Sequence, residues 1–167
     1  KQIDVLVERY SELENQRENI IASYKIMEES YCSGGKLLIA GNGGSAADSE
    51  HIVGELMKSF EKPRSLSEKY KEKLKSIDFE RGKTLSDKLQ GGLAAIALDG
   101  HIALSTAYMN DCEPLLCFAQ QVNGYGNEKD VFLGISTSGN SENIIYAAIV
   151  AKAKGMKVIG LTGAKES

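Results

Sequence analysis

Apolar and polar residues follow two different periods along this chain. Four short segments are almost continuously apolar and have the length of strands, at 36–40, 93–98, 131–135 and 157–161. Such runs are typical of strands in a parallel sheet that is covered on both faces. Between the runs, apolar residues recur at helical spacing. This alternation predicts an α/β fold, a parallel sheet flanked by helices on both faces as in flavodoxin/Rossmann-like three-layer sandwiches.

A long amphipathic segment precedes the first predicted strand. Apolar residues recur at helical spacing from Ile3 to Tyr31, and charged residues fill the other faces. This pattern predicts a long N-terminal helix over 1–33, or two helices in tandem. One small sheet cannot cover the whole apolar stripe, so we expect part of it to pack against another subunit. Packing across its own domain is the alternative.

The segment 61–90 differs in character from the rest of the chain. Pro63 ends the preceding helical pattern, and a highly charged stretch with weak helical periodicity follows. We expect an inserted pair of short helices or a lid over a ligand crevice. A solvated excursion without a role remains the alternative.

A loop rich in hydroxyl groups follows the strand at 131–135 and precedes a predicted helix. It contains Ser136, Thr137, Ser138 and Ser141. Open α/β sheets bind ligands at this kind of junction, where helix N–H groups favour an anion. The loop contains no lysine and the chain has no G-x-x-x-x-G-K-[ST] motif, so a sugar monophosphate fits better than a nucleoside triphosphate. A polar turn with a serine N-cap explains the same residues equally well.

A second loop, formed by Asn42, Gly43, Gly44 and Ser45, follows the first predicted strand. Parallel strands point the same way, so both loops should lie at one edge of the sheet and flank a crevice. The glycines do not form G-x-G-x-x-G, which makes dinucleotide binding a weak alternative.

His51 and Glu55 lie four residues apart on the helix that follows this glycine-rich loop. This spacing places both on one helix face, where they could bind a divalent metal together or divide acid and base work. Two ligands do not complete a zinc site. The alternative is an exposed pair without a function. His101, the other histidine, lies in a turn and is expected to be structural or exposed to solvent.

Composition narrows the function classes. The 167 residues suit one domain over 1–167, and a net charge of −3 provides no basic field for nucleic acid or an anionic membrane. No apolar run approaches the ~20 residues of a membrane span. The three cysteines lack paired spacing, which favours a reduced, cytoplasmic protein. The first residue is not Met, and we expect both ends to be trimmed relative to the gene product.

The two loops, H-x-x-x-E, Asn110-Asp111 and G-I-S-T-S-G-N-S at 134–141 together resemble the sugar isomerase (SIS) domain family, and within it the phosphoheptose isomerase branch. The resemblance covers nearly the whole chain. It implies that Glu55 is the catalytic base and that His51 and Glu55 bind zinc. It also implies a set of substrate-binding residues: Asn42, Gly43, Gly44, Ser45, Asn110, Asp111, Ser136, Thr137, Ser138 and Ser141.

The resemblance further implies the conversion of sedoheptulose 7-phosphate to D-glycero-D-manno-heptose 7-phosphate by ketose–aldose isomerisation through an enediol(ate). Family members are homotetramers with sites where subunits meet. They complete the zinc site with a Gln and a His on a further C-terminal strand and helix, which we expect to be missing here, so that the zinc site is incomplete. The alternative is a non-catalytic SIS protein that binds a sugar phosphate or associates with the DnaA initiator.

Overall fold

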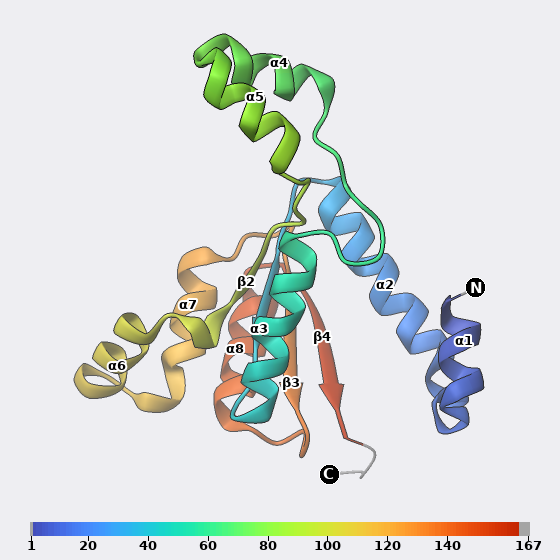
Figure 1. The fold of residues 1–167 in the computed structure, drawn as a ribbon. Coiled ribbons are helices and arrows are strands. Elements are labelled where there is room, and N and C mark those ends of the chain that lie inside the picture. The colour runs from blue at the N-terminus through green and yellow to red at the C-terminus, as the bar shows by residue number, and fades with distance from the viewer. Residues whose placement is uncertain (1, 164–167) are drawn as a thin grey trace.

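The computed structural model describes residues 2–163; Lys1 and residues 164–167, which belong to the predicted helix at 1–33 and to the predicted domain, lie outside them. The elements in chain order are shown in Figure 1: α1 (Gln2–Arg9), η1 (Ser11–Gln16), α2 (Arg17–Cys32), β1 (Leu37–Ala40), α3 (Gly44–Met57), α4 (Glu68–Ile77), α5 (Phe79–Lys88), β2 (Ala95–Ala97), η2 (Leu98–Gly100), α6 (Ile102–Asp111), η3 (Pro114–Leu116), α7 (Cys117–Tyr125), β3 (Val131–Ser136), α8 (Glu142–Ala153) and β4 (Lys157–Thr162).

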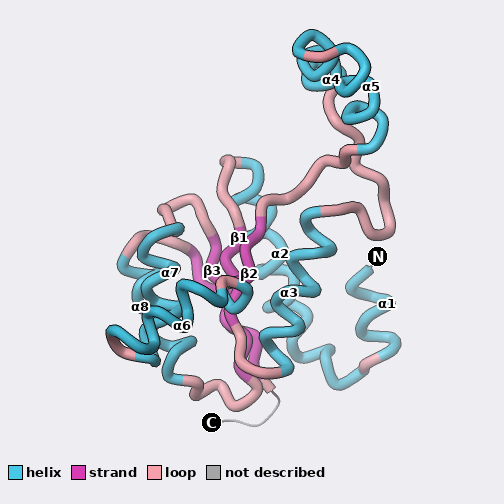
Figure 2. The backbone as a smooth tube through the Cα atoms, turned by 60° about the vertical axis from the view of Figure 1, so that its left-hand side comes forward, coloured by secondary structure: helices cyan, strands magenta, loops and turns pink. Residues whose placement is uncertain are grey.

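The four strands form one parallel sheet in the order β2-β1-β3-β4. Helices α2 and α3 lie on one side of the strands, and α6, α7 and α8 lie on the other (Figure 2). This arrangement confirms the predicted α/β fold. The chain passes from β1 to β2 on one side and then crosses to β3 on the other side of β1. The order therefore reverses between β1 and β3, and such switch points are where open α/β sheets bind ligands.

Alternate side chains of the strands build a core on each face of the sheet. Leu38 and Phe132 are fully buried in the cluster that includes α7 and α8. Leu37 and Ile39 belong to the cluster on the opposite face, against which apolar residues of α2 and α3 pack. The burial of both faces explains why the strands are almost continuously apolar in the sequence.

The N-terminal segment is not one helix. The 3-10 helix η1 separates α1 from α2, after a break at Tyr10, which has φ −133° and ψ 80°. Within η1, Leu13 is the one apolar residue, so no continuous stripe favours a straight helix there. Arg17 at the start of α2 pairs with Asp4 of α1 at 2.8 Å and holds α1 beside it. The prediction of tandem helices is therefore confirmed, and that of one long helix is wrong.

Residues 66–89, which we call the arm, form a helical hairpin that projects away from the sheet (Figures 1 and 2). Helices α4 and α5 pack closely where Gly82 faces the Leu74 carbonyl. Arg64 fixes the base of the arm, because its guanidinium donates to the carbonyl oxygens of Gly91 and Leu56, each at 2.6 Å. The predicted pair of short helices is confirmed.

The arm does not lie over the crevice of its own subunit. It joins the end of α3 to the start of β2, where Leu93 N–H donates to the Leu56 carbonyl. The starts of parallel strands lie at the opposite edge of the sheet from the loops that follow β1 and β3. Figure 1 shows the arm beyond that opposite edge. The prediction of a lid over this crevice is therefore wrong.

Candidate functional site

Two loops meet at the carboxyl edge of β1 and β3, and we call residues 41–44 and 137–141 the loop edge. Glycine is required in the first loop for two reasons. A Cβ on Gly41 would lie 2.4 Å from the Ser45 carbonyl oxygen, and Gly43 has a φ of +55°. The chain thereby turns sharply from β1 into α3 and leaves Asn42, Gly43 and Gly44 exposed.

The second loop leaves the N-terminus of α8 without a side-chain cap. Ser141 occupies the N-cap position, but its side chain makes no capping hydrogen bond. Its hydroxyl lies 2.9 Å from that of Ser136 instead. The N–H groups of Ile144 and Ile145 donate to the Ser141 carbonyl, each at 3.0 Å. Those of Glu142 and Asn143, which precede the first intrahelical hydrogen bond, have no acceptor among the described residues and are available to a ligand. Of the two readings that the residues left open, the geometry does not support the serine N-cap.

Helix α3 begins in the same way at the neighbouring loop. Its N-cap residue is Gly43, which has no side chain with which to cap. The loop edge thus holds two uncapped helix N-termini on either side of the β1/β3 switch point. Both helix dipoles present partial positive charge there, and hydroxyl groups surround it, which suits a phosphate-sized anion. Ser136 is buried and Ser141 half-buried, while Thr137 and Ser138 are exposed.

A reciprocal pair of hydrogen bonds joins the first loop to the first turn of α8, directly after the second loop. Asn42 Nδ2 donates to Asn143 Oδ1 at 2.9 Å, and Asn143 Nδ2 donates to Asn42 Oδ1 at 2.8 Å. The two residues lie 101 positions apart in the chain. The sequence analysis missed Asn143. The signal available was an asparagine in the first turn of the helix that follows the hydroxyl-rich loop.

His51 and Glu55 lie further along α3. His51 is exposed, and the Glu55 side chain is 29% exposed and forms an ion pair with Lys58 at 3.3 Å. Glu55 Oε2 is buried and has no hydrogen-bond partner. An open carboxylate oxygen and an imidazole four residues away are suitable donors for zinc. Within residues 2–163, however, no group of three or more His, Cys, Asp or Glu side chains could hold a metal, so the two donors fit only part of a zinc site.

Helix α3 carries Glu55 away from the loop edge. Eleven residues separate Gly44 from Glu55, which corresponds to about 16 Å along an α-helix. Glu55 and the loop edge therefore lie at different heights along α3.

Asn110 and Asp111 end α6 and are exposed. Asn110 Nδ2 donates to Asp111 Oδ1 at 2.9 Å. No hydrogen bond connects either side chain to the loop edge among the residues that the structure describes. Their predicted contact with substrate hydroxyls stays a prediction.

Asp99 follows β2 at the same edge of the sheet and was missed by the sequence analysis. Its Oδ1 atom is buried without a hydrogen-bond partner. Burial, together with the charge of Glu50 on α3, raises the pKa of the Asp99 carboxyl. Its sequence context, a turn after a strand, does not distinguish it from a solvated residue. His101 caps α6 by accepting from Leu104 N–H at 3.4 Å, as expected for a structural histidine.

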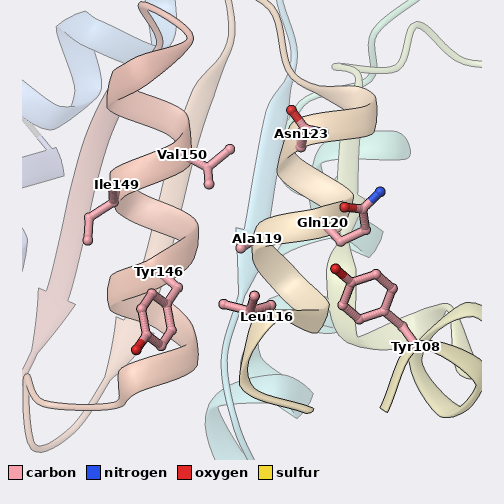
Figure 3. A pocket seen from close by; sticks show the side chains of 8 residues that line it. All are labelled: Tyr108, Leu116, Ala119, Gln120, Asn123, Tyr146, Ile149 and Val150. Carbon is pink, nitrogen blue, oxygen red and sulfur yellow. The ribbon is translucent and has the colours of Figure 1, made fainter. Parts of the chain in front are cut away.

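A shallow groove of about 240 Å³ lies on the outer side of the helical layer. Figure 3 shows Tyr146 and Ile149 projecting from α8 on one side and Tyr108 from α6 on the other. None of the predicted site residues lines this groove. In the described part of the chain, no helix combines the length and the hydropathy that a bilayer span requires.

Known proteins are similar to this chain over most of its length. A family model described as the SIS domain matches residues 78–163. A phosphoheptose isomerase of Burkholderia pseudomallei (strain K96243) is 42% identical over 134 residues, covering 80% of this chain and 55% of the relative. One of Thermodesulfovibrio yellowstonii is 38% identical over 152 residues, covering 89% and 63%. The chain thus spans between half and two thirds of the length of these curated relatives.

Solved structures are similar over nearly all of this chain. A phosphoheptose isomerase from Francisella tularensis has a TM-score of 0.68 and 32% identity, covering 98% of this chain and 76% of that one. The enzyme from Neisseria gonorrhoeae has the same TM-score and 30% identity, covering 98% and 69%. These two proteins are therefore similar to the chain in sequence as well as in fold.

Proposed function

The chain belongs to the SIS domain family and, within it, to the phosphoheptose isomerases, and from this premise we propose that the protein converts sedoheptulose 7-phosphate to D-glycero-D-manno-heptose 7-phosphate. One observation carries the proposal. Two helix N-termini without side-chain caps, those of α3 and α8, flank the switch point between β1 and β3. The N–H groups at these helix ends that lack an acceptor, and the surrounding hydroxyls, suit the phosphate of such a substrate.

In this proposal the phosphate binds among Ser136, Thr137, Ser138 and Ser141. The sugar chain extends towards the glycine-rich loop at 41–45, where exposed backbone and the Asn42 amide offer hydrogen bonds. Asn110 and Asp111 contact sugar hydroxyls. Binding of the phosphate, which lies away from the reacting carbons, supplies energy that orients the substrate at the reacting centre.

The proposed reaction moves one proton between adjacent carbons. The Glu55 carboxylate removes a proton from C1 of the ketose, and O2 is protonated, which gives the enediol. C2 then receives a proton and O1 loses its own, which leaves the aldehyde at C1. The unpartnered Glu55 Oε2 supports this role, because a carboxylate with a free oxygen can accept a proton.

We also propose that His51 and Glu55 contribute two donors to zinc and that the remaining donors come from outside the described residues. When bound, the metal would polarise the substrate oxygens as a Lewis acid. Two observations support a homotetramer with sites shared between copies. Tyr10 and Tyr24 near the N-terminus are 53% and 59% exposed. Glu55 lies eleven residues along α3 from the loop edge. The free cysteines and negative net charge support a cytoplasmic location and no nucleic-acid partner.

An assay of the full-length gene product with sedoheptulose 7-phosphate tests the proposal. We expect conversion to the aldose, loss of activity after chelation and recovery with zinc, and light scattering by a species of about four subunits. Binding of the sugar phosphate by a zinc-loaded tetramer without turnover would contradict the enzymatic role. That result would favour a non-catalytic SIS protein.

A further inference from the structure

The reciprocal amide pair Asn42–Asn143 is the direct side-chain connection between the two loops of the site. It lies beside both uncapped helix N-termini, because Asn42 precedes the N-cap of α3 and Asn143 lies in the first turn of α8. In each amide the oxygen accepts from the partner and the nitrogen donates to it. Each side chain therefore fixes the orientation of the other.

The two ends of this pair differ in how their elements are packed. Helix α8 packs directly on β3, because a Cβ at Gly134 would come within 2.6 Å of Ile144 Cγ2, and Ile144 is buried. Asn143 is the neighbour of Ile144 and is thus mounted on a well-packed helix. Asn42 is exposed and lies between Gly41 and Gly43, so no apolar side chain beside it anchors this loop to the core.

From this asymmetry we infer that Asn143 is a positioning residue: it holds Asn42, and with it the glycine-rich loop, at a fixed distance from the phosphate loop. The inference rests on the proposed function, in which one sugar phosphate spans both loops. Asn143 then sets the spacing between the bound phosphate and the polar chain of the sugar. A ligand that occupies only the phosphate loop does not depend on that spacing.

The substitution Asn143→Ala separates these two cases. It removes the amide but keeps the backbone N–H at the start of α8, and alanine is a good helix former. We expect binding of sedoheptulose 7-phosphate to weaken by about tenfold, since misplacement of a binding group by an ångström carries a penalty of this order or more. Binding of inorganic phosphate should change by less than about twofold. Asn123→Ala, on the exposed surface of α7, is the matched control.

A double-mutant cycle with Asn42→Ala shows whether Asn143 acts through Asn42. Calorimetry on the full-length protein should find that Asn143→Ala has no further effect once Asn42 is alanine. A fresh tenfold loss in that background would overturn the inference, because Asn143 would then act on the ligand by itself. Equal weakening of inorganic phosphate binding would overturn it as well, since it would indicate general loosening of the loop.

The wild-type protein distinguishes the failure of the inference from that of the proposed function. If wild type binds sedoheptulose 7-phosphate and Asn143→Ala binds it equally tightly, the inference alone is overturned. If wild type binds inorganic phosphate but not the sugar phosphate, the proposed function fails, and the inference falls with it. Melting temperatures of the single variants within a few degrees of wild type would confirm that the variants are folded.

Discussion

The helices of the arm and those of the loop edge begin in opposite ways. In the arm, the side chains of Ser67 and Asp78 accept hydrogen bonds from backbone N–H groups three residues further on, at 3.4 and 2.9 Å. At the loop edge, Gly43 and Ser141 occupy the same helix position and make no such bond. The arm closes its helix ends with its own side chains, and the loop edge leaves them open.

In the proposed function, this difference separates a region whose helix ends are stabilised by its own side chains from a region that binds a ligand. An N-cap side chain contributes about 1 kcal/mol to helix stability. The loop edge lacks that contribution at two helices. Residue type does not reveal which helix ends are capped. Ser67 caps α4, whereas the hydroxyl of Ser141 contacts that of Ser136 and leaves α8 uncapped.

The largest effect on activity is expected from substitution of Glu55, with Glu68 of the arm as the control. Both form an ion pair with a lysine three residues on, but Glu55 also has a buried oxygen without a partner. Glu55→Gln should lower kcat at least ~10²-fold in the full-length protein, because the amide is not a base. Glu68→Gln should leave kcat unchanged, since an exposed pair contributes only ~0.3–0.5 kcal/mol to stability.

Steady-state isomerisation of sedoheptulose 7-phosphate by both variants provides the measurement. If Glu55→Gln turns over at the wild-type rate, Glu55 is a surface residue like Glu68. Glu55 on α3 and Glu68 on the arm would then not differ in function.

A smaller effect is expected from Gly82→Ala in the arm. The added Cβ would lie 2.4 Å from the Leu74 carbonyl, so α4 and α5 must separate. We expect a destabilisation of about 1–3 kcal/mol, confined to the arm and visible as faster amide exchange there. Gly124→Ala, in a helix with open space around it, should be neutral or stabilising. Faster exchange at the loop edge in Gly82→Ala would show that the two regions are not independent.

The smallest effects concern two carboxyl groups with opposite pKa shifts. Burial raises the pKa of Asp99. The contribution of its protonated form to stability is therefore full below the unfolded-state pKa, about 4, and is lost as pH rises through the folded-state pKa. Asp99→Asn should therefore raise Tm at pH 7, with a gain that disappears in acid. The Arg81 backbone N–H, and then its guanidinium, lower the pKa of Asp78. Asp78→Asn should lower Tm at pH 7 by an amount that also shrinks in acid.

Melting curves between pH 3 and pH 7 measure both shifts. A lower Tm for Asp99→Asn at neutral pH would mean that Asp99 is paired in solution. The contrast between an unsatisfied carboxyl near the site and a satisfied one in the arm would then be wrong.

Much of the fold could be predicted from the apolar pattern alone. Strands buried on both faces must be almost continuously apolar, so β1 and β3 are visible in the sequence. The break at η1 was less visible, because it depends on Arg17 reaching back to Asp4. The position of the arm could not be predicted from its own residues. It follows from the topology, because the arm leads into the start of β2.

The loops of the candidate site could also be located, because parallel strands bring residues that follow β1 and β3 to one edge. The sequence did not reveal how Ser141 is oriented or that Asn42 meets Asn143. Both depend on distances between segments about a hundred residues apart. The roles of His51, Glu55, Asn110 and Asp111 stay predictions, because side chains from outside residues 2–163 belong to the expected site.

The central claim is that the loop at residues 137–141, together with the uncapped N-terminus of α8, binds the phosphate of the substrate. Calorimetry of sedoheptulose 7-phosphate with wild type and with the double variant Ser138→Ala, Ser141→Ala tests it most directly. Loss of two hydroxyl donors should weaken binding by about tenfold or more. Tm should fall only slightly, because each serine loses one local hydrogen bond, to Ser136 or from Asn140 N–H, and no helix cap is lost. Unchanged affinity in the double variant would contradict the account.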